Sequence, residues 1–401
     1  MLRPMSSGFD ISYFADSNGR EPHKRFGIRQ NDRLFHLYAI GRTGAGKTTM
    51  LETLAIQDIR AGRGLCLIDP HGDLAERLHR QVREQRKKDL AYLDAADPRQ
   101  PFGYNPLRKV HPSKVPLAAS GLLEAFKKLW GDAWGVRMEH VLRNSMYALL
   151  EYGEATLPDL LRLFVDRSFR DRVLLKVANP QVREFWLKEY AAYQPRFRQE
   201  AIAPIQNKVG AFLADPRMER LLTRPPVDLH LRRIMDEEKI LIVNLAKGRL
   251  GDDTANLLGA LLVSTLSLAA FSRADMPEEA RRPFFLYIDE FQNFTTLALA
   301  SMVSELRKFR VGLVLAHQHL HQLEPDVRHA VLANVGTMVA FRLGPEDAPL
   351  FAKEFAPDFE AGDLLNLPHH DIILRLMIDA APSRPFSATT LRPGDLEECA
   401  R

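Results

Sequence analysis

Cysteine is scarce in this sequence. Among 401 residues there are two, Cys66 and Cys399, which lie far apart and near no pattern of metal ligands. Disulfide-rich scaffolds and structural zinc sites need several cysteines at short, regular spacings. The pair therefore argues against both classes of protein, and it favours a reducing, cytoplasmic compartment.

Long apolar runs are also missing. The most apolar stretch, residues 257–271, has fifteen residues and includes Ser264, Thr265 and Ser267. A membrane-spanning helix needs about 20 apolar residues. We therefore expect a buried helix beside a sheet and no membrane span. The first residues, MLRPMSSGFDISYF, lack a continuous apolar core, so no signal peptide is expected.

The overall composition is that of a globular protein. Hydrophobic residues make up 46% and charged residues 26% of the chain, and its length suffices for one large or two medium domains. The net charge of +4 is compatible with a polyanionic partner but does not by itself indicate one.

A glycine-rich turn follows an apolar strand at residues 37–50, LYAIGRTGAGKTTM. The turn matches G-x-x-x-x-G-K-[ST], the pattern of phosphate-binding loops. Its glycines let backbone N–H groups surround a phosphate, and the next helix points its N-terminus at that anion. The residues predicted to bind ATP are Gly41, Arg42, Thr43, Gly44, Ala45, Gly46, Lys47, Thr48 and Thr49. Lys47 is expected to reach the β- and γ-phosphates, and Thr48 to bind Mg²⁺.

A second strand, FFLYIDEF at residues 284–291, ends in two acids. Asp289 is predicted to hold Mg²⁺, and Glu290 to act as the general base that activates water. A water-activating carboxylate beside a metal ligand suits an ATPase better than a small-molecule kinase.

Two further strands end in polar groups. Gln318, in LVLAHQHL, is placed to sense the γ-phosphate or the attacking water. His317, His319 and His321 alternate around it like metal ligands, but no second cluster supports a metal site. In LIDPHGD, Asp69 and His71 could order nucleotide or water, or Asp69 could cap the next turn; the sequence leaves both open.

The order of elements predicts an α/β fold. Strands and helices alternate up to about residue 106, helices broken by prolines fill residues 112–235, and alternation then resumes. We expect a nucleotide-binding domain in two parts, residues 1–111 and 236–401, with an all-helical insertion at 112–235. Three consecutive domains are the alternative.

Several segments together resemble the HerA/FtsK superfamily of pumping ATPases, and most of all the conjugative coupling proteins of type IV secretion. They are IGRTGAGKTTML, DIRAGRGLCLIDPHGDLAERL, FFLYIDEFQNF, SELRKFRVGLVLAHQHL and NVGTMVAFRLGPEDA. The resemblance implies a RecA-like core with a mostly parallel sheet, a helical insertion, and a hexameric ring that moves DNA with ATP. The sequence shows no pattern for the N-terminal membrane helices, the β-barrel or the C-terminal winged helix that particular members of this superfamily carry. We therefore expect a motor that consists of the RecA-like core and the helical insertion.

In such rings a neighbouring subunit supplies an arginine to the γ-phosphate. Arg342, in VAFRLG, is the favoured candidate, with Arg307 and Arg310 as rivals. A helix is expected over residues 74–88. Its arginines, spaced every three residues along 77–88, could face phosphates, although a solvated helix face is favoured.

These patterns predict an ATP-driven DNA translocase in which Glu290, Lys47, Gln318 and Arg342 are catalytic. A secretion apparatus or a nuclease is a possible partner. The alternatives are a secretion or pilus ATPase with a protein cargo, and a nucleotide-switched scaffold.

Overall fold

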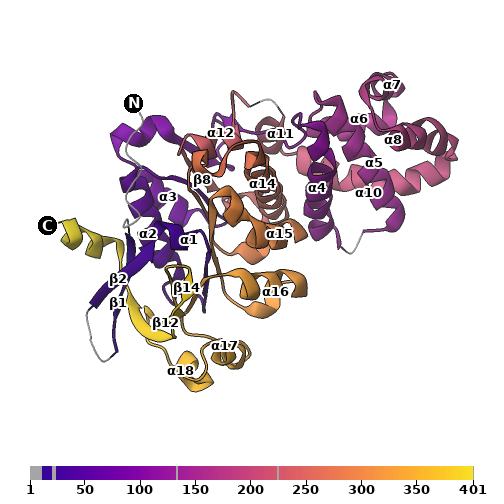
Figure 1. The fold of residues 1–401 in the computed structure, drawn as a ribbon. Coiled ribbons are helices and arrows are strands. Elements are labelled where there is room, and N and C mark those ends of the chain that lie inside the picture. The colour runs from indigo at the N-terminus through magenta and orange to yellow at the C-terminus, as the bar shows by residue number, and fades with distance from the viewer. Residues whose placement is uncertain (1–10, 20–23, 132–133, 224, 401) are drawn as a thin grey trace.

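A large sheet forms the centre of the molecule, which is described by a computed structural model at residues 11–19, 24–131, 134–223 and 225–400 (Figure 1). Eleven strands of the described residues pair in the order β2-β1-β15-β12-β11-β3-β10-β9-β4-β8-β5. In that order they are β2 (Lys24–Arg29), β1 (Ile11–Ser17), β15 (Phe386–Thr390), β12 (Asp371–Arg375), β11 (Thr337–Ala340), β3 (Leu37–Ile40), β10 (Val311–His317), β9 (Phe284–Ile288), β4 (Gly64–Asp69), β8 (Ile240–Asn244) and β5 (Leu90–Asp94).

The seven strands from β11 to β5 run parallel, and β12, β15, β1 and β2 continue the sheet with antiparallel pairs. The central strands are buried on both faces, which explains their continuous apolar sequences. The expected α/β fold with a mostly parallel sheet is confirmed.

Helices cover both faces of the sheet. The helix after the phosphate loop, α2 (Lys47–Ala61), and α3 (Asp73–Gln81) pack with one face. The apolar helix α14 (Asp252–Ser272) packs with the other. Of the helices described, α14 alone is long and apolar enough to cross a membrane, and 72% of its apolar window is buried inside the molecule. The expectation of a buried helix beside the sheet is confirmed.

The helical segment, residues 112–223, stands at one side of the sheet, with α4 against α14 (Figure 1). Its helices are α4 (Val115–Leu129), α5 (Val136–Tyr152), α6 (Leu157–Val165), α7 (Arg167–Lys176), α8 (Pro180–Glu184), α9 (Tyr190–Ala192), α10 (Pro195–Leu213) and α11 (Pro216–Leu222). Five of them begin with proline in the first turn, where its missing N–H costs nothing. Where this segment joins the rest of the chain, β6 (Phe102–Gly103) pairs with β7 (Val227–Asp228).

The helix expected over 74–88 ends early. α3 stops at Gln81, Val82 is extended, and a 3-10 helix follows at Glu84–Asp89. The arginines of this region therefore do not form one continuous helical stripe. Arg77 pairs with Glu52, and Arg80 pairs with Glu76 on an exposed surface.

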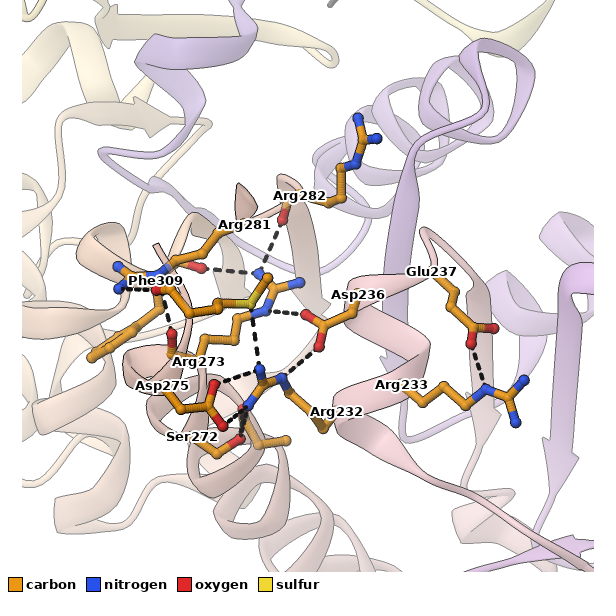
Figure 2. A network of polar contacts seen from close by, with 12 residues as sticks. Arg232, Arg233, Asp236, Glu237, Ser272, Arg273, Asp275, Arg281, Arg282 and Phe309 are labelled. Atoms are coloured by element: carbon orange, nitrogen blue, oxygen red, sulfur yellow. Dashed lines mark hydrogen bonds and ion pairs between the residues drawn. The ribbon is translucent and has the colours of Figure 1, made fainter. Parts of the chain in front are cut away.

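A buried arginine fixes the amino ends of two central strands (Figure 2). Arg273, just after α14, donates through Nη1 to the carbonyls of Arg282 and Phe309, both at 2.9 Å. Its Nε donates to Asp236 of α12 (Leu231–Asp236) at 2.9 Å. These carbonyls lie just before β9 and β10. Arg273 therefore fastens α12 and α14 to the amino ends of these strands, whereas Asp289 and Glu290 follow the carboxyl end of β9.

Candidate nucleotide site

The phosphate loop lies where several parallel strands end side by side. Gly41 N–H donates to His317 O of β10 at 3.3 Å, and Asp289 N–H donates to Ile68 O of β4 at 3.2 Å. The loop, the acids and Gln318 are therefore brought together at the carboxyl ends of β3, β9 and β10. This edge of an open α/β sheet is where ligands bind.

Two glycines of the loop have left-handed backbone conformations, with φ of 76° at Gly44 and 122° at Gly46. Residues with a Cβ rarely adopt such positive φ angles. At Gly46 a Cβ would also lie 2.8 Å from Nδ1 of His370. Arg42, Thr43 and Gly44 form an exposed tip, whereas Ala45 and Gly46 are buried below it. The glycines thus shape a cradle of backbone amides at the start of α2.

Lys47 is buried and folds back onto its own loop. Its Nζ donates to Gly41 O at 2.6 Å and to Arg42 O at 3.1 Å. Burial lowers the pKa of Lys47, and the negative charges of Glu290 and Asp289 partly oppose that shift. The ammonium is thereby held beside the cradle, where a phosphate oxygen could replace the carbonyls. Thr49, two residues further along α2, is half-buried.

Thr48 and Asp289 meet directly, because Thr48 Oγ1 donates to Asp289 Oδ2 at 3.0 Å. Burial raises the pKa of Asp289 to about 6, helped by the charges of Glu290 and Asp69 and opposed by Thr48 and Lys47. A hydroxyl and crowded carboxylates are the oxygen ligands that Mg²⁺ prefers. A divalent cation there would relieve the repulsion that raises this pKa, so the residues fit the metal.

Glu290 is held by two glutamine side chains. Gln318 Nε2 donates to Oε1 at 2.7 Å, and Gln292 Nε2 donates to Oε2 at 2.5 Å. Thr43 Oγ1 donates to Gln318 Oε1 at 2.8 Å, which joins the tip of the phosphate loop to this pair. Glu290 itself has a φ of 48°, a strained conformation for a residue with a side chain. One hydrogen-bonded chain therefore links Thr43, Gln318 and Glu290.

Asp69 caps the turn that follows β4. Its carboxylate accepts from the N–H groups of His71 and Ala75, both at 2.9 Å. Of the two possibilities left open by the sequence, the structure supports capping, while the charge of Asp69 still acts on Asp289.

The three histidines around Gln318 point to different partners. His317 is buried between Tyr38 and Phe291, and burial lowers its pKa to about 3. His319 contacts buried Asp347 at 3.2 Å, and His321 faces Glu346 at 3.5 Å. Within the part of the chain that the structure describes, no three His, Cys, Asp or Glu side chains converge as metal ligands.

The candidate arginines lie at opposite ends of the parallel strands, Arg342 at the carboxyl ends and the other two at the amino ends. Arg342 follows β11 beside its own phosphate loop, since its carbonyl accepts from Arg42 N–H at 3.0 Å. Arg307 and Arg310 come before β10, at the other end of the strands. Arg307 is exposed, with its guanidinium 3.5 Å from the centre of the Phe35 ring. Arg342 therefore adjoins the phosphate loop of its own chain, whereas Arg307 lies at the opposite ends of the strands.

Two residues near the site were not predicted from the sequence. His370 donates its N–H to Ala45 O at 3.2 Å and places its ring against Gly46, although it lies more than 320 residues away. Only the three-dimensional path of the chain brings His370 to the loop. Gln292 binds Glu290 from the 3-10 turn Phe291–Phe294; it lies within the segment FFLYIDEFQNF, which assigned it no role.

Comparisons with known proteins agree with this architecture. The sequence-family model of the type IV secretion-system coupling protein DNA-binding domain matches residues 26–355. The unbound bacterial conjugative coupling protein TrwBdeltaN70 has a TM-score of 0.68 at 16% identity, covering 96% of this chain and 95% of its own. TrwB with ADP and Mg²⁺ gives 0.66 at 15% identity, with 96% of each chain covered.

VirB4 of Thermoanaerobacter pseudethanolicus has a TM-score of 0.67 at 13% identity, covering 98% of this chain and 99% of its own. No curated protein sequence matches significantly. At these identities the solved structures establish the shared RecA-like fold, which the sequence predicted. The family model spans most of the chain, and so the chain belongs to the family of type IV secretion-system coupling protein DNA-binding domains.

Proposed function

We propose that this protein binds ATP with Mg²⁺, hydrolyses it, and uses the energy to move DNA through a ring of six subunits. The observation that carries the ATPase proposal is the chain of contacts from the phosphate loop through Gln318 to Glu290, beside the pair formed by Thr48 and Asp289. Family membership supports DNA as the partner.

Each residue has a distinct role in this proposal. The amides around Gly44 and Gly46 and the ammonium of Lys47 hold the phosphates, and Thr48 and Asp289 hold the metal. Bound Mg²⁺ would neutralise charge on the phosphates. Glu290 accepts a proton from the attacking water, while Gln318, bonded to both Thr43 and Glu290, reports whether the γ-phosphate is present.

The DNA partner is tested by ATPase assays and by binding at several salt concentrations. We expect DNA to stimulate ATP turnover. Affinity should fall steeply with salt, because binding releases counterions; a protein with six or more phosphate contacts loses about 10³-fold between 50 and 200 mM salt. Fluorescence anisotropy with labelled DNA measures this slope. Salt-insensitive or absent binding would instead favour a protein cargo, and slow turnover indifferent to DNA would favour a scaffold.

The arginine that acts between subunits is proposed to be Arg307, because it is exposed at the ends of the strands opposite its own phosphate loop. Arg307→Ala is expected to lower kcat about 10³-fold, the effect of losing an arginine finger. Mixing Arg307→Ala with Lys47→Ala subunits should restore turnover. In a mixed ring, the intact nucleotide site of an Arg307→Ala subunit can face the intact Arg307 of a Lys47→Ala subunit.

Arg342→Ala serves as the matched variant in the same mixing assay. An arginine that acts within its own chain cannot be supplied by a neighbour, so Arg342→Ala mixed with Lys47→Ala should stay inactive. Restoration by Arg342→Ala and not by Arg307→Ala would reverse the assignment.

A further inference from the structure

The helical segment touches the loop that carries the general base through one lysine. Lys128, near the end of α4, donates from Nζ to the carbonyl of Gln292 at 2.8 Å and to the hydroxyl of Thr295. Gln292 and Thr295 belong to the turn that directly follows Asp289 and Glu290. A side chain from the helical segment thus binds the backbone only two residues from the general base.

Hydrogen bonds connect this contact to the carboxylate of Glu290. The backbone carbonyl of Gln292 accepts a hydrogen bond from Lys128, and its side-chain amide donates one to Glu290 Oε2. Thr295 Oγ1 also donates to the Gln292 carbonyl at 3.1 Å, so Lys128 and Thr295 hold the same oxygen. Displacing that carbonyl would move the residue whose side chain orients Glu290.

Tight packing leaves this turn little room to absorb a displacement. A Cβ on Gly259 of α14 would lie 2.3 Å from the ring of Phe294, so helix and turn are in close contact. α4 is fixed to the same helix, because Ser264 Oγ donates to Gly121 O at 3.0 Å. Packed interiors transmit such shifts because they hold few voids.

The charge of Lys128 strengthens the contact. A charge-assisted hydrogen bond is about twice as strong as a neutral one. Lys128 is exposed as a whole, whereas its contact with Thr295 is partly buried. Burial lowers the pKa of Lys128 to about 8, and the charge of Glu324 opposes the shift.

We propose that Lys128 is a positioning residue that couples the helical segment to Glu290, so that movement of α4 changes the rate of hydrolysis and nucleotide turnover moves α4. The proposal rests on the proposed ATPase function. It assigns no contact between Lys128 and the substrate; the lysine acts through Gln292 and Thr295.

The kinetic test compares Lys128→Met with Lys127→Met, which removes the neighbouring exposed ammonium from the same helix. Small errors in the position of a reacting group cost rate, up to about 10²-fold for 1 Å. We expect Lys128→Met to lower kcat about tenfold and leave KM for ATP unchanged, because the phosphate loop is untouched. Lys127→Met should behave like the wild type. Unchanged kcat in Lys128→Met, or an equal loss in both variants, would overturn the proposal.

A double-mutant cycle with Thr295→Val tests whether the two partners act as a unit. Thr295→Val alone should lower kcat in the same direction, and Lys128→Met with Thr295→Val should lose less than the product of the single effects. Strictly multiplicative losses would mean that the two side chains act separately, against the proposed coupling.

Hydrogen exchange gives a readout that does not depend on turnover. In nucleotide-free protein, amides of residues 290–296 should exchange faster in Lys128→Met than in Lys127→Met. Addition of a non-hydrolysable ATP analogue with Mg²⁺ should change exchange in residues 115–129 of the wild type and of Lys127→Met, but not of Lys128→Met. Equal exchange in both variants would overturn the coupling, whereas a wild type that neither binds the analogue nor hydrolyses ATP would overturn the proposed function alone.

Discussion

Glu290→Gln is expected to lower kcat for ATP hydrolysis by about 10²–10⁴-fold, the usual contribution of a general base. The amide cannot accept the proton of the attacking water, yet it has nearly the shape of the carboxylate. Nucleotide binding should survive, because Lys47, Thr48 and the loop amides are unchanged. The variant should therefore hold ATP without turning it over.

Single-turnover assays and binding of a fluorescent ATP analogue measure the two effects separately. Glu200→Gln, which changes an exposed glutamate of α10, is the matched control and should hydrolyse ATP normally. Full turnover in Glu290→Gln would show that another group accepts the proton.

Arg33→Met is expected to lower the free energy of unfolding by about 3 kcal/mol, because it leaves the buried carboxylate of Asp58 without its main ion-pair partner. Both nitrogens of the Arg33 fork bind Asp58, at 2.6 and 2.8 Å, and both side chains are at most 2% exposed. Burial opposes ionisation of Asp58, but Arg33 and Arg63 hold its pKa below the usual value. Tyr287 joins the cluster by donating to Asp58 at 2.5 Å.

Urea unfolding monitored by circular dichroism measures this loss. The double variant Arg33→Met with Asp58→Leu should recover part of it, because both buried charges are then gone. Arg80→Met removes an arginine from an exposed pair and should change stability by about 0.5 kcal/mol or less. A loss in Arg33→Met no larger than in Arg80→Met would contradict the prediction.

The cluster also matters for the site, because it joins two elements that carry it. Asp58 lies on α2, which begins at Lys47, and Tyr287 lies on β9, two residues before Asp289. Arg33 thus ties the helix that follows the phosphate loop to the strand that ends just before Asp289.

The parts of this protein that sequence predicts best are those where one local pattern fixes the chemistry. Residues 41–48 and 284–291 carry their spacing and flanking strands with them, so the loop and the acids could be placed at one edge. α14 was predictable as a helix because its apolar run of fifteen residues, 257–271, is too long for a strand.

Other features depend on contacts between distant residues. The antiparallel strands β1, β2 and β15 are not marked by long apolar runs. In β1 only Ser12, Phe14 and Ala15 are buried, and its pairing joins Ala15 to Thr390 across the whole chain. The helix predicted to reach Lys88 ends at Gln81, because Val82 turns into the core. Arg342 was favoured as the arginine that acts between subunits from its place in a motif, and this assignment stays a prediction.

The strand order has a consequence for synthesis on the ribosome. In the sheet as described, β3 lies between β10 and β11, β4 between β8 and β9, and β5 beside β8 alone. None of these three early strands can pair until strands from beyond the helical segment have been made. At about 5–20 residues per second, the nascent chain waits on the order of tens of seconds with its apolar strands unpaired. The helical segment can collapse during that interval, whereas GLCLID must be kept from aggregation until β8 leaves the ribosome, and LYAI until the last third of the chain does.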